Sequence, residues 1–150
     1  ERLVTELRKK RKNVHWIAEM VPKDAAIQLY SHADVFCCPS IYEPFGIINL
    51  EAMACETPVV GSAVGGIKEI VIPEETGLLV AFDQQPEAPF EPVDPEGFAQ
   101  DLAAALNDLM ADGDRRLAMA KAGRKRAEDH YAWRRVAEET VALYRRLLKA

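Results

Sequence analysis

Residues 35–51, with the sequence VFCCPSIYEPFGIINLE, contain the change of pattern that decides the fold. An apolar run over residues 35–38 is followed by a proline-containing loop, and residues with helical spacing begin at Ile47. A short buried strand, a loop and a helix in this order are typical of one unit of a parallel α/β sheet.

The same alternation continues on both sides of this stretch. Apolar runs predict four strands, at residues 14–17, 35–38, 59–60 and 78–80. The segments between them have helical spacing, and strands joined by such crossovers lie parallel in one sheet. We therefore expect an α/β fold, a Rossmann-like, doubly wound parallel sheet with flanking helices, formed by residues 1–150 as one partial domain.

The last third of the chain is predicted to be helical. Asp94-Pro95 has the form of an N-cap followed by proline at the first helical position. Gly113 is expected to end that helix, and Asp114 to cap the next one. A C-terminal helix over residues 126–148 carries an apolar stripe. We expect this stripe to pack against an apolar core, some of which could belong to a domain outside these residues.

Residues 83–95 form a Pro-rich loop within the domain. Proline recurs at every third position from Pro86 to Pro95, which is the repeat of a polyproline II helix. We expect a semi-rigid surface loop, and docking of a partner is the alternative interpretation.

The composition fits one globular domain and excludes several classes of protein. The chain has 150 residues, of which 49% are hydrophobic and 29% charged, so intrinsic disorder is excluded. No uncharged apolar run reaches the roughly 18 residues that span a bilayer, and the first residues form no secretory signal. Three cysteines without metal-ligand spacing indicate reduced thiols, no metal site and a cytoplasmic protein.

Charge is unevenly distributed along the chain. The net charge is −5, and residues 24–113 hold 16 acidic groups with Lys68 as their single cation. The one dense basic run, residues 8–12, lies at the end of a predicted helix, where cations interact favourably with the helix dipole. We therefore expect no binding of nucleic acid.

The loop and helix start at residues 43–51 form the candidate site. Ligands of open parallel sheets bind at the carboxyl ends of strands, near helix N-termini. Gly46 permits close backbone approach, and the free N–H groups from Gly46 to Ile48 suit an anion such as a diphosphate. Glu43 and Glu51 flank these groups and can accept hydrogen bonds from sugar hydroxyls. The combination predicts a nucleotide-sugar site, although either carboxylate alone is equally consistent with simple solvent exposure.

The chain resembles the retaining GT-B glycosyltransferases of family 4. The segments that carry the resemblance are Pro39-Ser40-x-x-Glu43-x-Phe45-Gly46-x-x-x-x-Glu51-Ala52-Met53-Ala54, Pro58-Val59-Val60, Gly65-Gly66 and Thr76-Gly77-Leu78-Leu79-Val80. Two further segments, Trp16-Ile17-Ala18-Glu19-Met20 and Tyr42-Glu43-Pro44, indicate the bacterial glycogen synthase branch, which uses ADP-glucose. The resemblance implies a hexosyltransferase that needs no cofactor and generally no metal.

The resemblance also implies roles for individual residues. Glu43 would contact the hexose hydroxyls near the reacting carbon as the catalytic residue, and Glu51 would bind the ribose hydroxyls. Met20 or Val21 would line the base pocket. The donor sugar and phosphate would be held by the backbone N–H groups of Phe45, Gly46, Ile47 and Ile48. The acceptor, a glucan or another sugar, would be bound mainly by an N-terminal domain absent from this chain.

Two departures from the family pattern affect these expectations. Glu56 replaces the usual glycine after the helix, at a cost of about 1 kcal/mol. The phosphate-binding arginine and lysine of the family lie upstream of these residues, so we expect the isolated chain to bind donor weakly and to be inactive. The missing sheet neighbours of residues 14–17 predict either a homodimer or a fragment of a longer chain.

Several alternatives stay open at this stage. Glucosyl transfer to glucose 1-phosphate, which makes maltose 1-phosphate, is a close relative of α-glucan synthesis. A non-catalytic module that binds sugar nucleotides would have the same motifs. Gly65-Gly66 is consistent with a tight turn, with a phosphate cradle or with a wall of the acceptor cleft.

Overall fold

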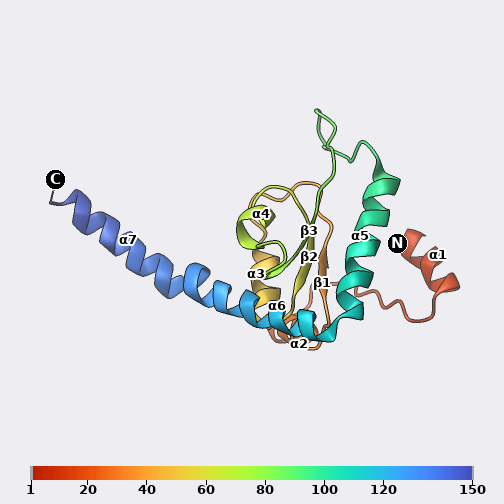
Figure 1. The fold of residues 1–150 in the computed structure, drawn as a ribbon, viewed down its shortest axis with the longest axis horizontal. Coiled ribbons are helices and arrows are strands. Elements are labelled where there is room, and N and C mark those ends of the chain that lie inside the picture. The colour runs from red at the N-terminus through yellow and green to blue at the C-terminus, as the bar shows by residue number, and fades with distance from the viewer. Residues whose placement is uncertain (1, 150) are drawn as a thin grey trace.

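The computed structural model describes residues 2–149 and contains a three-stranded parallel sheet between two layers of helices (Figure 1). The strands lie in the order β1-β2-β3 and comprise β1 (Phe36–Cys38), β2 (Val59–Ser62) and β3 (Gly77–Val80). Phe36 is paired with Val59, which is paired in turn with Gly77. The predicted α/β fold with a parallel sheet and flanking helices is confirmed.

Seven α-helices and one π-helical turn are present in the described residues. They are α1 (Arg2–Lys10), α2 (Lys23–Ser31), α3 (Ile47–Ala54), α4 (Ile67–Ile70), α5 (Pro95–Ala111), α6 (Gly113–Arg126), the π-helical turn η1 (Ala127–Tyr131) and α7 (Trp133–Leu147). Among these residues, no helix combines the length and the apolar character that crossing a bilayer requires.

Two apolar clusters hold the sheet, one on each face. Because side chains alternate along a strand, Val59 packs against Met53 and the α4 residues, whereas Val60 packs toward α5 and α6. Leu109 of α5 and Met119 of α6 are buried in this second cluster. Figure 1 shows the two layers, with α3 and α4 on one side of the strands and α5 on the other.

The strand predicted at residues 14–17 is absent. These residues form an irregular segment in which Trp16 is 40% exposed and Ile17 is 55% exposed. A strand exists only when a neighbour accepts its hydrogen bonds, and no strand of the described residues lies beside this segment. The apolar pattern of residues 14–17 is therefore not sufficient to form a strand without a neighbouring strand.

The structure confirms the predicted start of α5 but not the predicted boundary between α5 and α6. Asp94 caps α5 as predicted, because its carboxylate accepts a hydrogen bond from Gly97 N–H at 2.9 Å. The cap of α6 is Asp112 and not Asp114, since Asp112 accepts from Arg115 N–H at 2.9 Å. Gly113 consequently begins α6 instead of ending α5.

The predicted C-terminal helix over residues 126–148 is divided in the structure. The chain passes through η1 and turns at Ala132, whose backbone is extended, before α7 begins. No residue of α7 is buried, and Trp133 is 83% exposed. Its apolar stripe does not join either cluster of this chain, and Figure 1 shows α7 extending away from the sheet.

The Pro-rich loop over residues 83–95 is a short hairpin. Val93 N–H donates to the Asp83 carbonyl at 2.8 Å, and a polyproline II segment has no such internal hydrogen bonds. The loop contacts the segment before the candidate site, where the Tyr42 and Phe90 rings stack with centroids 6.0 Å apart.

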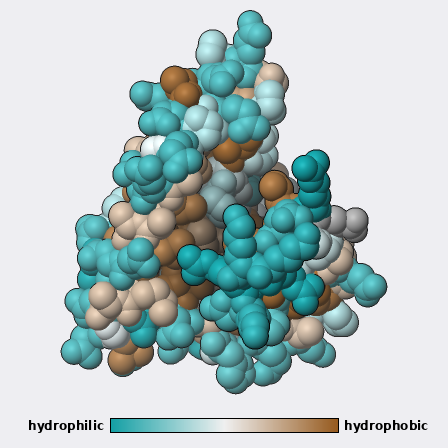
Figure 2. Space-filling model, turned by 90° about the vertical axis from the view of Figure 1, so that its right-hand side faces the viewer, coloured by the Kyte–Doolittle hydropathy of each residue, from teal (hydrophilic) through white to brown (hydrophobic). Residues whose placement is uncertain are grey.

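On the face shown in Figure 2, hydrophilic residues cover most of the surface and hydrophobic residues gather near its centre.

The second residue after α3, Glu56, has the left-handed backbone that the sequence indicated. Glu56 has φ 58°, in the region where glycine is favoured. Its side chain is exposed and lies 3.8 Å from Arg124 in an ion pair that contributes little to stability. The expected strain at this position is therefore present.

Candidate functional site

The candidate site begins where β1 ends and α3 starts. Gly46 is the N-cap of α3 and has φ 94° and ψ 46°. A Cβ atom here would lie 2.7 Å from Asn49 Nδ2 and 3.3 Å from Glu43 Cγ. Both the backbone angles and the space therefore require glycine, which explains why the chain can turn sharply from the loop into the helix.

In the described part of the chain, the first N–H groups of α3 and of its N-cap have no internal backbone partner. Within residues 2–149, no backbone oxygen accepts a hydrogen bond from the N–H groups of Gly46, Ile47 or Ile48. Ile47 is 56% exposed and Ile48 is 38% exposed. Unpaired N–H groups at a helix N-terminus bind anions, because the helix dipole adds to the hydrogen bonds. The unpaired N–H groups of Gly46, Ile47 and Ile48 are therefore candidates for binding a phosphate group.

The turn at Gly65-Gly66 lies directly against the loop that carries Glu43. Gly66 N–H donates to the Glu43 carbonyl at 3.0 Å. A Cβ atom on Gly65 would lie 1.9 Å from that carbonyl oxygen, and one on Gly66 would lie 2.4 Å from the Phe45 oxygen. The glycines therefore permit a close backbone contact that fixes residues 43–45, which favours the tight-turn interpretation.

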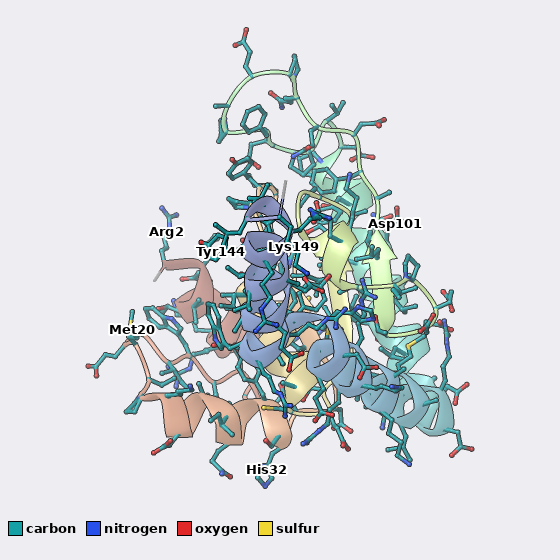
Figure 3. The ribbon with its side chains drawn as sticks, turned by 90° about the vertical axis from the view of Figure 1, so that its left-hand side faces the viewer. Arg2, Met20, His32, Asp101, Tyr144 and Lys149 are labelled. Carbon is teal, nitrogen blue, oxygen red and sulfur yellow. The ribbon has the colours of Figure 1, made fainter. Side chains whose placement is uncertain are left out.

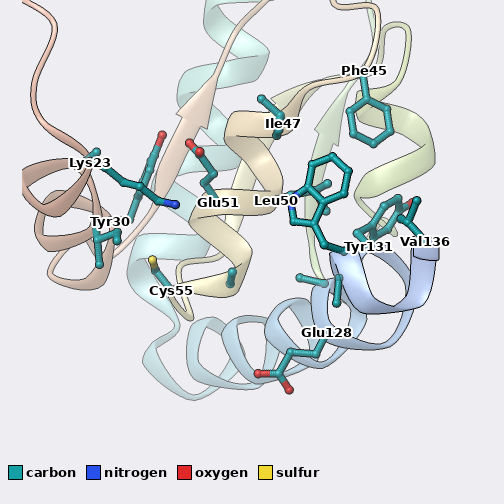
Figure 4. A pocket seen from close by; sticks show the side chains of 16 residues that line it. Lys23, Tyr30, Phe45, Ile47, Leu50, Glu51, Cys55, Glu128, Tyr131 and Val136 are labelled. Atoms are coloured by element: carbon teal, nitrogen blue, oxygen red, sulfur yellow. The ribbon is translucent and has the colours of Figure 1, made fainter. Parts of the chain in front are cut away.

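A pocket of about 740 Å³ opens beside α3 (Figure 4). Its walls come from α2, α3, η1 and the first turns of α7, and most of its lining is apolar. The lining residues are Lys23, Ala26, Ile27, Tyr30, Phe45, Ile47, Leu50, Glu51, Ala54, Cys55, Ala127, Glu128, Tyr131, Ala132, Trp133 and Val136. A mostly apolar cavity with a few polar groups is typical of a small-molecule site.

Three polar groups of the pocket lie on the side of α2, whereas Glu128 and Tyr131 of η1 lie elsewhere on its wall. Figure 4 shows Lys23 and Tyr30 from α2 on the same side of the pocket as Glu51 of α3. Burial raises the pKa of Tyr30, and the negative charge of Glu51 raises it further. Tyr30 is therefore a neutral phenol at physiological pH and can donate a hydrogen bond beside the Glu51 carboxylate.

The structure brings together some of the predicted site residues and separates others. Phe45, Ile47 and Glu51 line the pocket, whereas the side chain of Glu43 lies against Gly46. Ile48 follows on α3 but does not line the pocket.

The two residues predicted for the base pocket lie elsewhere, in the segment between α1 and α2. Met20 is 99% exposed, and its neighbour Val21 is partly buried. Figure 3 shows Met20 at the outside of this segment. Neither residue borders the pocket.

Three residues of this region are not identified by the sequence patterns. Lys23 directly precedes the acidic stretch that begins at residue 24, yet it faces the same pocket as Glu51. Tyr30 has the spacing of an apolar helix face, which gives no sign of its polar role. Asn49 carries a detectable signal, because it is a polar residue three positions after Gly46 inside an otherwise apolar helix start.

The π-helical turn η1 packs against the site loop at Phe45. The Tyr131 hydroxyl donates to the Glu69 carbonyl at 2.8 Å, and Arg126 Nη2 donates to the same oxygen at 2.7 Å. The Tyr131 ring meets the Phe45 ring edge-on, with centroids 6.2 Å apart. Turns of this kind occur frequently at functional sites. Here the turn links the site loop to the end of α4.

Metal-binding groups are scattered across the described residues. No three His, Cys, Asp or Glu side chains within residues 2–149 come together as a metal site. Cys37, Cys38 and Cys55 are free, and burial raises the pKa of the Cys37 thiol.

Comparison with known proteins identifies the family to which the chain belongs. The profile of the family described as "Glycosyl transferases group 1" matches residues 2–91. An alpha-maltose-1-phosphate synthase from Mycolicibacterium smegmatis is 44% identical over 144 residues, which cover 96% of this chain and 35% of that protein. A second one, from Mycobacterium tuberculosis, is 42% identical over 144 residues, again covering 96% of this chain and 35% of the relative.

Solved structures agree with this result. A sucrose-phosphate synthase from Thermosynechococcus elongatus superimposes with a TM-score of 0.78 and 36% identity, and the match covers 99% of this chain and 34% of that one. The Anabaena protein HepE, solved in complex with UDP, superimposes with a TM-score of 0.60 and 26% identity. That match covers 77% of this chain and 29% of that one.

The α/β arrangement of this chain is the one that these solved structures share. The chain belongs to the group 1 glycosyltransferases, family 4 of the GT-B fold, and corresponds to their C-terminal domain. It spans about 35% of the length of the maltose-1-phosphate synthases that it matches. These relatives do not support the expected glycogen synthase branch, since both are named alpha-maltose-1-phosphate synthases.

Proposed function

We propose that this chain is the donor-binding region of an enzyme that transfers a glucosyl group from a nucleoside diphosphate glucose to glucose 1-phosphate. The configuration at the transferred carbon would be retained, and the product would be α-maltose 1-phosphate. The observation that carries the proposal is the open set of N–H groups from Gly46 to Ile48, next to a pocket that contains Glu51. The names and the identity of the relatives support the choice of acceptor.

The N–H groups at the start of α3 would stabilise the leaving group. When the bond between the sugar and the diphosphate breaks, negative charge grows on the phosphate oxygen. N–H groups already directed at that position stabilise the charge without reorganisation of solvent. The helix dipole adds to this effect, which is largest within the first turn of α3.

The two carboxylates would orient the donor at its two ends. Glu43 would accept hydrogen bonds from hexose hydroxyls close to the reacting carbon. Glu51, on the polar side of the pocket, would accept hydrogen bonds from the ribose hydroxyls. Met20 or Val21 would approach the base only in the whole protein, since neither borders the pocket of this chain.

Within this chain, Lys23 would supply part of the positive charge that the phosphate-binding arginine and lysine of the family provide. It lines the pocket on the α2 side, where it can balance some of the donor charge. One exposed amine does not replace an arginine and a lysine that contact the diphosphate directly. Residues 1–150 alone should therefore bind ADP-glucose weakly and have no transferase activity. Calorimetry that gave micromolar affinity for the isolated chain would contradict the expectation of weak binding.

The proposal is tested with the full-length gene product that contains this chain. The protein is incubated with ADP-glucose or UDP-glucose and with glucose 1-phosphate or glycogen, and the products are separated by anion exchange and identified by mass. We expect a phosphorylated disaccharide from glucose 1-phosphate. ADP-glucose is the donor that the family resemblance implies, and the HepE complex with UDP justifies testing uridine as well.

Two variants separate the possible outcomes. Glu43→Ala should reduce turnover by orders of magnitude, whereas Glu75→Ala, which changes an exposed carboxylate outside the site, should not. Elongation of glycogen without any phosphorylated disaccharide would favour the α-glucan activity instead. Nucleotide-sugar binding with no turnover on any acceptor would favour a non-catalytic binding module.

A further inference from the structure

Asn49 is a completely buried polar side chain on α3, and it faces the loop at Gly46. Its exposed fraction is 0%. The side-chain Nδ2 donates to the Gly46 carbonyl at 3.2 Å, and the backbone N–H of the same residue donates to the same oxygen at 2.9 Å. One residue therefore holds the Gly46 carbonyl with two donors.

This arrangement leaves the other end of the side chain unsatisfied. Asn49 Oδ1 is buried and accepts no hydrogen bond from the described residues. A buried acceptor without a partner destabilises a fold, and such groups are rare in proteins. The neighbouring buried positions of α3, Ala52 and Met53, are apolar. For stability alone, an apolar residue of similar size would serve better at position 49.

The benefit of Asn49 lies in what it does to Gly46. A glycine with φ 94° has many other backbone conformations available, so a hydrogen bond to its carbonyl restricts it. The Gly46 carbonyl and the Ile47 N–H belong to the same planar peptide group, so hydrogen bonds that hold this carbonyl against α3 also fix the direction of that N–H group. The amide of Asn49 also occupies the space into which a Cβ atom at Gly46 would project, at 2.7 Å.

We propose that Asn49 is a positioning residue that holds the N–H groups at the start of α3 in the geometry that a donor diphosphate requires. Asn49 does not touch the ligand, because its side chain is fully covered, and it acts through the Gly46 carbonyl. The inference rests on the proposed function, since it assigns Asn49 a role in the same site. It adds that this role is kept at the expense of the stability of the fold.

The test replaces Asn49 by leucine in the full-length gene product. Asn49→Leu removes the side-chain donor and the unsatisfied oxygen together, while the Gly46 carbonyl keeps the backbone hydrogen bond at 2.9 Å. We expect the affinity for ADP or UDP, measured by calorimetry, to fall about tenfold. We expect the midpoint of thermal unfolding to stay the same or to rise. Met53→Leu, a buried apolar exchange on the same helix, should change neither affinity nor midpoint appreciably.

A second variant keeps the shape of the side chain. Asn49→Asp replaces the donor nitrogen by an oxygen, so a carboxylate repels the Gly46 carbonyl and weakens nucleotide binding. Protonation restores a donor at this position. The ratio of wild-type to variant affinity should therefore decrease as the pH is lowered. Protonation of a buried carboxylate would also relieve a defect of the fold, so the comparison is made over the pH range in which circular dichroism shows the variant to be folded.

The outcomes are distinguishable. Wild-type nucleotide affinity in Asn49→Leu would overturn the inference and leave the proposed function intact. A fall in affinity that is matched by a fall in the unfolding midpoint would also overturn it, since Asn49 would then act only through the fold. Failure of the wild-type protein to bind either nucleotide would overturn the proposed function and this inference together.

Discussion

The contact between the Gly65-Gly66 turn and the Glu43 loop offers a direct test of how the site is positioned. Replacing Gly65 by alanine adds one Cβ atom, which would lie 1.9 Å from the Glu43 carbonyl oxygen. Such contacts are not tolerated below 3.0 Å, so the two segments must separate by about 1.1 Å. Residue 65 also has φ 44°, a conformation in which alanine is strained and cannot absorb the change locally.

The displacement acts through the backbone on Glu43, which we propose as the catalytic residue. Gly66 N–H donates to the Glu43 carbonyl at 3.0 Å, and a movement of this size lengthens or breaks that hydrogen bond. Misplacement of a reacting group by about 1 Å lowers rates by roughly 100-fold, which corresponds to about 2.7 kcal/mol at the transition state. We therefore expect Gly65→Ala to reduce kcat/KM for glucosyl transfer by about this factor.

The assay is the glucosyl transfer reaction of the full-length gene product, with circular dichroism to check that the fold persists. Gly113→Ala is the matched control, because a Cβ atom at Gly113 meets nothing within 4 Å and this residue begins α6. It should keep full activity. Gly65→Ala with a folded spectrum and activity within about threefold of wild type would refute the reasoning, since the required displacement would then have no effect on Glu43.

Three further predictions concern stability and titration. Leu109→Ala, at a fully buried position between α5 and the sheet, should lower the free energy of unfolding in urea by about 2–5 kcal/mol. Leu117→Ala, at a position that is 52% exposed, should change it little. Glu56→Gly should raise the same quantity by about 1 kcal/mol, because φ 58° suits glycine; a decrease would show that the left-handed backbone costs nothing here. The raised pKa of Tyr30 means that its protonated form stabilises the fold below about pH 10, and that this contribution is lost as the pH rises through the folded-state pKa. Absorbance titration of tyrosinate should place Tyr30 above the ordinary range, and Glu51→Gln should lower its pKa toward that range; an unchanged titration would remove Glu51 as a cause.

Local patterns in the sequence were sufficient where the cause is local. Asp94 caps α5 because an N-cap carboxylate can accept a hydrogen bond from the free N–H group three residues later. Glu56 adopts the left-handed backbone because the helix ends there, whatever the residue type. The start of α3 after Gly46 followed from the same reasoning. Each of these features depends on only a few consecutive residues.

The features that the sequence did not predict depend on groups far apart in the chain. Residues 14–17 have a strand pattern but lack a neighbouring strand in the described residues, and no pattern supplies one. Lys23 and Glu51 lie 28 positions apart in the sequence, yet α2 and α3 place both on one pocket. The predicted cap of α6 was wrong for a different reason. Asp112 and Asp114 both flank Gly113, and only the geometry shows which carboxylate reaches a free N–H group.

The pocket and the exposed stripe of α7 are physically one surface. Trp133 and Val136 line the pocket and also open the apolar stripe of α7, so the two regions meet without a polar boundary. Tyr131, immediately before α7, contacts Phe45 in the site loop and hydrogen-bonds the end of α4. A segment that packs on the first turns of α7, over Trp133 and Val136, would therefore border the pocket as well. The hydrogen bonds that hold η1 to the Glu69 carbonyl come from Arg126 and Tyr131 and do not involve α7. Gly46 and Asn49, which we propose to position the N–H groups, lie outside the lining of the pocket, so a contact at Trp133 would border the pocket without touching either residue.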